Sequence, residues 1–163
     1  MYSLPILRTV SLVGLTSLSL ALASCGKTPP APVVLSAPIS ASAGSLAVSA
    51  RLSGSDEVPP VTGSAVGRVE ASLNAQSHML TWTATYSGLT GAASAAHFHG
   101  PAAVGENAGV VVPISGSLAS PITGTTTLTD AQTADVLAGK WYLNLHTAAH
   151  PNGEIRGQLS VQR

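Results

Sequence analysis

Apolar and polar residues alternate with a period of two along most of the chain after residue 45. The clearest run joins Leu80, Trp82, Ala84 and Tyr86 to threonines at the positions between them. Because successive side chains of a strand point to opposite faces, this run predicts a half-buried strand with threonine on its outer face. Similar patterns predict further strands around 46–53, 68–73, 93–99, 109–115, 122–128, 141–147 and 154–162. We therefore expect an all-β fold, a Greek-key-like sandwich or barrel of about eight strands.

One short helix, near 130–138, is predicted to interrupt the strands. Thr129 and Gln132 have the spacing of a capping box, and Gly139 can end the helix. Val136 and Leu137 are expected to pack over one end of the sheet, which is a structural role without chemistry.

The C-terminal part of the domain predicts a hairpin. Asn152 and Gly153 form a dipeptide typical of tight turns, so the strands on either side of it should pair. Within 141–147 the apolar residues face one way, and Asn144 and His146 face the other way, on a polar face. The expected core contains Val69, Trp82, Tyr86, Leu143 and Leu145.

Composition and charge narrow the possible functions. The chain has 163 residues, of which 45% are hydrophobic and 9% charged, and seven basic residues balance seven acidic ones. One domain is the natural count for this length. A net charge of zero, without a cluster of lysine or arginine, excludes a nucleic-acid partner on electrostatic grounds.

The N-terminal residues 1–24 have the layout of a secretory signal, with Arg8, an uncharged run and small residues at the exit. The strictly apolar part is shorter than the roughly 20 residues that a membrane-spanning helix needs. The letters LASC, which end at Cys25, resemble the cleavage box of bacterial lipoproteins, so Cys25 is the expected lipidation site.

Cys25 is the only cysteine, so an internal disulfide is excluded. A thioether that carries lipid would make its sulfur unreactive and would anchor the chain to a membrane. Residues 25–45, rich in Pro, Ala and Ser, predict a tether, and residues 46–163 predict the folded domain. We expect an exported protein, anchored by its lipid to the bacterial cell envelope and facing the periplasm or the exterior. The sequence identifies no protein partner.

Histidines provide the candidate chemistry. His97 and His99 are two apart on a predicted strand, so their imidazoles project to the same face and form half of a metal site. His146, on the polar face of another strand, is the expected third ligand, and His150 is a tentative fourth. His78 lies in a polar turn and is left out of the site. The alternative is that these histidines are only hydrogen-bonded side chains.

Ligand type indicates which metal is expected. Imidazoles suit copper, zinc, iron or nickel, and the lack of cysteine and of a carboxylate cluster disfavours structural zinc, calcium and magnesium. Copper heads the affinity order, so copper is the predicted ion, with zinc and iron as alternatives.

Four segments together resemble the CHRD (chordin) domain family in its bacterial lipoprotein form. They are SGSDEVPPV (53–61), AAHFHGPA (95–102), WYLNLHT (141–147) and NGEIRGQL (152–159), and they occur in the family's order. The resemblance covers about 46–163. It implies an extracytoplasmic module, and it leaves open a non-catalytic adhesion or partner-binding unit.

A looser resemblance links the histidines to the copper-zinc superoxide dismutases, which are Greek-key proteins with an HxH pair and a late copper ligand. It implies a metalloenzyme acting on superoxide through His97, His99 and His146, although no counterpart of the zinc subsite or of the disulfide is present. Arg156 is then the candidate for anion guidance, with a solvated strand-face charge paired to Glu57 or Glu154 as the alternative. Metal storage without turnover is a third hypothesis.

Overall fold

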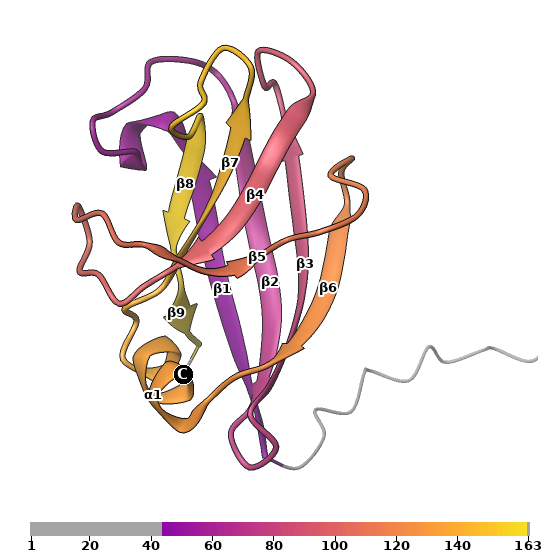
Figure 1. Cartoon of the computed structure of the whole chain (residues 1–163), viewed down its shortest axis with the longest axis vertical. Coiled ribbons are helices and arrows are strands. Elements are labelled where there is room, and N and C mark those ends of the chain that lie inside the picture. Colours follow the sequence, from indigo (N-terminus) through magenta and orange to yellow (C-terminus); the bar gives the residue numbers. More distant parts are fainter. Residues whose placement is uncertain (1–43, 163) are drawn as a thin grey trace, which may run out of the picture. The chain divides into compact units, whose positions relative to one another are not determined.

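The computed structural model describes residues 44–162, and these residues form an antiparallel β domain with one α-helix (Figure 1). The predicted all-β class with a short helix is confirmed. The strands are β1 (Ser45–Ser53), β2 (Val66–Asn74), β3 (Met79–Ser87), β4 (Ala93–His99), β5 (Val110–Pro113), β6 (Ile122–Thr127), β7 (Tyr142–Thr147), β8 (Ile155–Gln158) and β9 (Ser160–Val161). The helix α1 spans Asp130–Leu137, and a 3₁₀ turn spans Gly54–Asp56.

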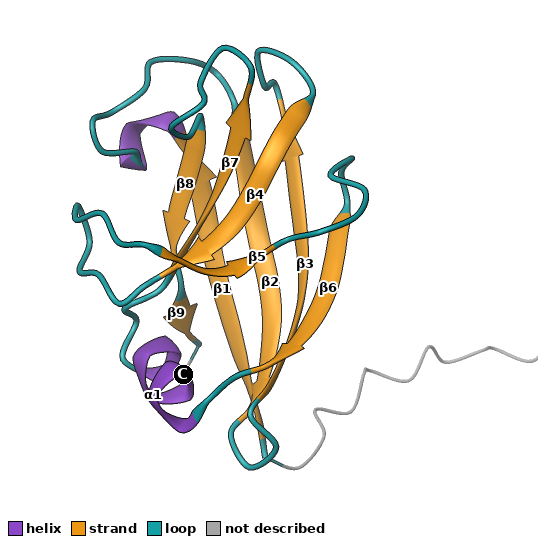
Figure 2. Cartoon of the chain, in the orientation of Figure 1, coloured by secondary structure: helices purple, strands orange, loops and turns teal. Residues whose placement is uncertain are grey.

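The strands belong to one sheet, in the order β5-β4-β7-β8-β1-β2-β3-β6, and β9 pairs with β1. The sheet curls into a half-barrel, so that β4, β7 and β8 lie over the long strands β1 to β3 (Figure 2). The order places β4 next to β7 although about 40 residues separate them in the chain. This long-range pairing brings the two histidine-bearing strands side by side.

The hydrophobic core fills the inner face of the curled sheet. Trp82 and Phe98 meet edge to face with ring centroids 5.1 Å apart, and Trp141 packs against the other side of Phe98. Of the predicted core residues, Val69, Trp82, Leu143 and Leu145 are buried. Tyr86 is half-buried against them, and its hydroxyl donates to the Leu118 carbonyl.

The helix begins and ends as predicted. Thr129 and Gln132 form both bonds of the capping box, and Gly139 follows the helix with φ +69°. Val136 is fully buried, but Leu137 is 40% exposed, so the prediction that both residues pack on the sheet is wrong for Leu137. The eight-residue helix presents only a narrow face to the domain, and the side chain of Leu137 falls outside it.

The strand predicted over 154–162 is two strands. β8 pairs with β7 and, at Arg156, with Ser53 of β1, whereas β9 continues along β1 after the pairing with β7 has ended. The two strands are therefore separate elements on opposite sides of Leu159. Gly157 permits the crossing: a Cβ atom at this position would lie 1.9 Å from the Arg51 carbonyl oxygen.

The first strand, β1, begins at Ser45, one residue before the predicted start of the domain. The predicted signal peptide, nearly all of the tether and Cys25 lie outside the described residues. Within residues 44–162, no helix has the length and apolar character needed to cross a membrane.

Candidate metal centre

Two neighbouring strands supply the histidine cluster, which we define as His97, His99 and His146. His97 lies opposite Asn144 in the β4–β7 ladder, and His146 lies opposite Ala95, one position along the same face. A register shift between Phe98 and His99 interrupts the pairing of β4 with β5 at the cluster. The i, i+2 spacing thus places His97 and His99 on one face, as predicted.

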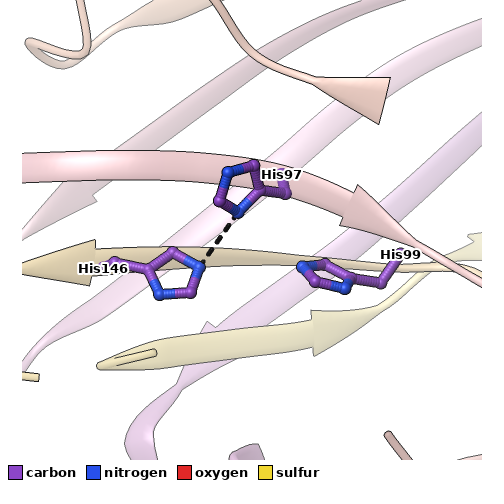
Figure 3. A group of neighbouring side chains, drawn as sticks. All are labelled: His97, His99 and His146. Carbon is purple, nitrogen blue, oxygen red and sulfur yellow. Dashed lines mark hydrogen bonds between the residues drawn. The ribbon is translucent and has the colours of Figure 1, made fainter. Parts of the chain in front are cut away.

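The three imidazole rings surround one small space (Figure 3). His97 Nδ1 lies 3.1 Å from His146 Nε2, and one nitrogen atom from each ring lies within 4.8 Å of the others. The His97 ring centroid is 4.9 Å from that of His146 and 5.6 Å from that of His99. The expected meeting of these three side chains is confirmed.

Backbone carbonyls orient two of the rings. His146 Nδ1 donates to the Pro151 carbonyl at 3.0 Å, and His99 Nδ1 donates to the Ala108 carbonyl at 2.9 Å. In the neutral ring, a proton held at Nδ1 leaves Nε2 with a free lone pair. His99 Nε2 is buried and has no hydrogen-bond partner among the described residues. Histidines that ligate metals characteristically donate their other ring N–H in this way.

Burial favours the neutral form of His97 and of His146. Desolvation lowers the pKa of His97 below 6.5, and His146 and His99 lower it further by repulsion. Desolvation also lowers the pKa of His146, against the opposing effect of its bond to Pro151. Metal ligation requires neutral imidazole, so both shifts favour it.

The polar face of β7 is covered as completely as its apolar face, because all six residues of the strand are buried. Tyr142 stacks flat on His99, with ring centroids 4.8 Å apart, and its hydroxyl accepts from Ala108 N and donates to Ala108 O. The segment 103–109 therefore covers this face. The alternation pattern predicted the polar face correctly but gave no sign that a loop buries it.

Arg156 is buried beneath the same loop. Its guanidinium lies 3.5 Å from the centroid of the Tyr142 ring and donates to the Glu106 carbonyl and to Asn107 Oδ1. The side chain is 2% exposed, so the alternative of a solvated charge on the strand face is wrong. Its bonding partners are the loop and Gln158, and no ion pair with Glu57 or Glu154 is present among residues 44–162.

The two glutamates have other environments. Glu154 accepts from Thr90 and Thr147, and these bonds outweigh its desolvation and lower its pKa. Glu57 is buried, and desolvation, partly offset by Arg156, raises its pKa to about 7. Neither carboxyl group belongs to the histidine cluster.

His150 does not join the cluster. It follows the end of β7 and lies in the turn, where its backbone amide donates to Thr147 and its ring lies near Glu154. His78 is also elsewhere: its Nδ1 contacts Oγ1 of Thr133, a residue of the helix α1. The structure therefore does not bring His150, the tentative fourth ligand, together with the other three histidines, because residue 150 lies in the turn that follows β7.

Sequence reasoning missed Asn144, which lies between the histidines. Its Oδ1 is 3.1 Å from His146 Nε2, and the side chain is 4% exposed. Its position two residues before His146 on the polar face was a signal that could have identified it.

Comparisons with known proteins agree with the motifs. Neither a search of curated proteins nor a search of solved structures found a match. The family model of the CHRD domain matches residues 48–159, which include the EVPP segment, both histidine strands and the final GEIRGQL segment. The chain is a member of the CHRD domain family.

Proposed function

We propose that this CHRD protein binds one transition-metal ion through His97, His99 and His146 while lipid at Cys25 anchors it to the bacterial cell envelope. The observation that carries the proposal is the buried Nε2 atom of His99, which has no hydrogen-bond partner among residues 44–162. The Nδ1 protons of His99 and His146 are already held by main-chain carbonyls. A buried nitrogen lone pair without a donor costs about 1–3 kcal/mol, and a bound cation would remove that cost.

Copper is the proposed ion. Three imidazole nitrogens without a thiolate suit copper and also zinc or iron, and copper binds most strongly to such a donor set. Metal–nitrogen bonds of about 2.0–2.1 Å require that the three rings move slightly closer together. The CHRD membership suggests an extracytoplasmic setting, where this ion would be acquired after export.

The test is equilibrium binding of copper and, separately, of zinc to the purified domain. We expect one ion per chain. Each of the variants His97→Ala, His99→Ala and His146→Ala should weaken binding at least about tenfold, the loss that even an outer partner of a metal ligand can cause. His78→Ala and His150→Ala are matched controls and should bind as the wild type does. Equal affinity in wild type and in the His97→Ala/His99→Ala double variant would overturn the proposal.

Superoxide dismutation is a further activity that we propose for this site. It needs an open coordination position and a cation that attracts the anion. Arg156 supplies a positive charge on the same face of the sheet, although the loop covers it. A metal-loaded protein that leaves superoxide unchanged would reduce the function to metal binding or storage.

A non-catalytic adhesion module is the alternative in a different class. It would use the surface rather than the buried cluster, so metal content separates it from the other functions. Protein isolated from its own compartment without metal would favour this alternative.

A further inference from the structure

We infer that Asn144 is a fourth ligand of the proposed metal ion, so that three imidazole nitrogens and one amide oxygen form the site. The inference rests on the proposed function and goes beyond it by adding a neutral oxygen donor. It comes from the contacts of one atom, His146 Nε2, with its two polar neighbours. These neighbours are His97 Nδ1 and Asn144 Oδ1, each 3.1 Å away.

The first step concerns the protons of His146. Its Nδ1 faces the Pro151 carbonyl, which can only accept, so this nitrogen carries the proton. In the neutral ring, which metal ligation requires, Nε2 then offers one lone pair and no proton.

The second step concerns the two neighbours. Asn144 Oδ1 also has only lone pairs, so its contact with His146 Nε2 contains no hydrogen. If the Asn144 amide were flipped, its NH₂ group would point at His146 Nε2. It would then compete with an N–H on His97 Nδ1 for the single lone pair of that nitrogen. If His97 Nδ1 carried no proton, the contact between the two imidazoles would contain none. No combination of tautomer and amide orientation satisfies both contacts with neutral groups.

A cation removes this conflict. With His97 Nδ1 unprotonated, this nitrogen and Asn144 Oδ1 each present a lone pair 3.1 Å from the lone pair of His146 Nε2. His99 Nε2, which has no hydrogen-bond partner among the described residues, adds a fourth lone pair on the same face. A tetrahedral ion with bonds of about 2.0–2.1 Å holds its ligand atoms about 3.3 Å apart, close to both 3.1 Å contacts. Amide oxygen is a hard donor, so it favours a divalent ion such as Cu²⁺ or Zn²⁺.

Asn144 is held well for this role. It is 4% exposed on β7, and its backbone pairs with His97 on one side and with Arg156 on the other. An isolated buried amide oxygen against an imidazole lone pair has no stabilising function of its own.

The experiment uses Cu²⁺ added alone to the metal-free protein, with affinity measured by competition and the ligand set followed by electron paramagnetic resonance. Asn144→Leu keeps the approximate size and removes the oxygen, whereas Asn144→Asp keeps an oxygen at the same place. Asn74→Leu is the matched control: the Asn74 amide oxygen caps a turn next to β2, three strands away from β7 in the sheet order. Circular dichroism checks that each variant folds.

We expect Asn144→Leu to weaken Cu²⁺ binding about tenfold or more and to change the resonance spectrum. Asn144→Asp should bind at least as tightly as the wild type with a shifted spectrum, and Asn74→Leu should be unchanged. A folded Asn144→Leu with wild-type affinity and spectrum would overturn the fourth ligand and leave the three-histidine site intact.

The remaining outcomes are also decisive. If Asn144→Leu does not fold, the Asp variant decides, because an unaltered spectrum in it would overturn the inference. If the wild type binds no Cu²⁺ or Zn²⁺, the proposed function fails and the fourth ligand fails with it.

Discussion

His97 and His146 give the proposed site a specific pH dependence. Desolvation holds the pKa of both imidazoles below the ordinary 6.5, so protons compete with the metal only at lower pH than they would for exposed histidines. We expect copper affinity to be the same at pH 7.5 and 6.5 and to fall as the pH drops further. Binding titrations at pH 7.5, 6.5, 5.5 and 4.5 check this. A loss of affinity already complete at pH 6.5 would contradict it.

The same shifts affect the metal-free fold. Because the folded pKa of His97 and His146 is depressed, the unfolded chain takes up protons first as the pH falls through about 6.5. Their contribution to stability is therefore present above that pH and is lost below it. Bound metal and low pH act in opposite directions on the same two rings.

At this scale the sequence predicted which histidines lie together but not their setting. The HxH spacing and the polar face of the later strand were enough to select His97, His99 and His146. The carbonyls of Ala108 and Pro151, which fix the ring protons, belong to loops whose path follows from no local pattern. The sequence could not predict this half of the site, because main-chain acceptors carry no residue signature.

Among the elements, β8 depends most on a single residue. Gly157 lies against the Arg51 carbonyl, and any side chain there would force β8 away from β1. We expect Gly157→Ala to destabilise the domain by about 1–3 kcal/mol or more, as overpacking does. Chemical denaturation followed by circular dichroism measures the change. Gly63→Ala is the control, since a Cβ at that position meets no atom within 4 Å, and an equal effect of both substitutions would contradict the argument.

Strand prediction succeeded where one face is apolar and the other is open to water. The alternation in β2 and β3 follows burial closely. The prediction was incomplete for β7, which is buried on both faces. A period-two pattern separates the polar face of a strand from its apolar face, but it does not show what covers the polar face. The break at Leu159 was missed for a similar reason. The pairing with β7 ends at Gln158, whereas the alternation of apolar and polar residues continues into β9.

For the whole molecule, attachment to the membrane is predicted to depend on Cys25. The sulfur is the only thiol in the chain, and it follows a segment with the layout of an export signal. We expect Cys25→Ser to move the protein from the membrane fraction to the soluble fraction, or to leave it unprocessed. Fractionation of cells and mass measurement of the mature chain check this. Normal processing and continued anchoring of the variant would show that the lipoprotein interpretation is wrong.

The fourth ligand also affects what the whole molecule can do. A tetrahedral ion bound by three histidines and Asn144 would have no open coordination position. Closed coordination of this kind is typical of structural metal sites, whereas catalytic sites keep one position open. We then expect the site to store the metal ion or to stabilise the fold, and not to turn over superoxide. The family membership and the overall fold are compatible with either outcome, because a fold does not determine an activity.

The loop over the polar face is held mainly by its main chain. The Glu106 carbonyl accepts a hydrogen bond from Arg156, and the Ala108 carbonyl accepts from His99 and Tyr142. Among the loop's side chains, Asn107 also accepts a hydrogen bond from Arg156. Val104, by contrast, is 80% exposed. Most of the loop's own side chains can therefore be exchanged without disturbing the cluster beneath. We expect a fluorescent amino acid at residue 104 to report on the proposed metal ion, because Ala108 of the same loop accepts a hydrogen bond from His99.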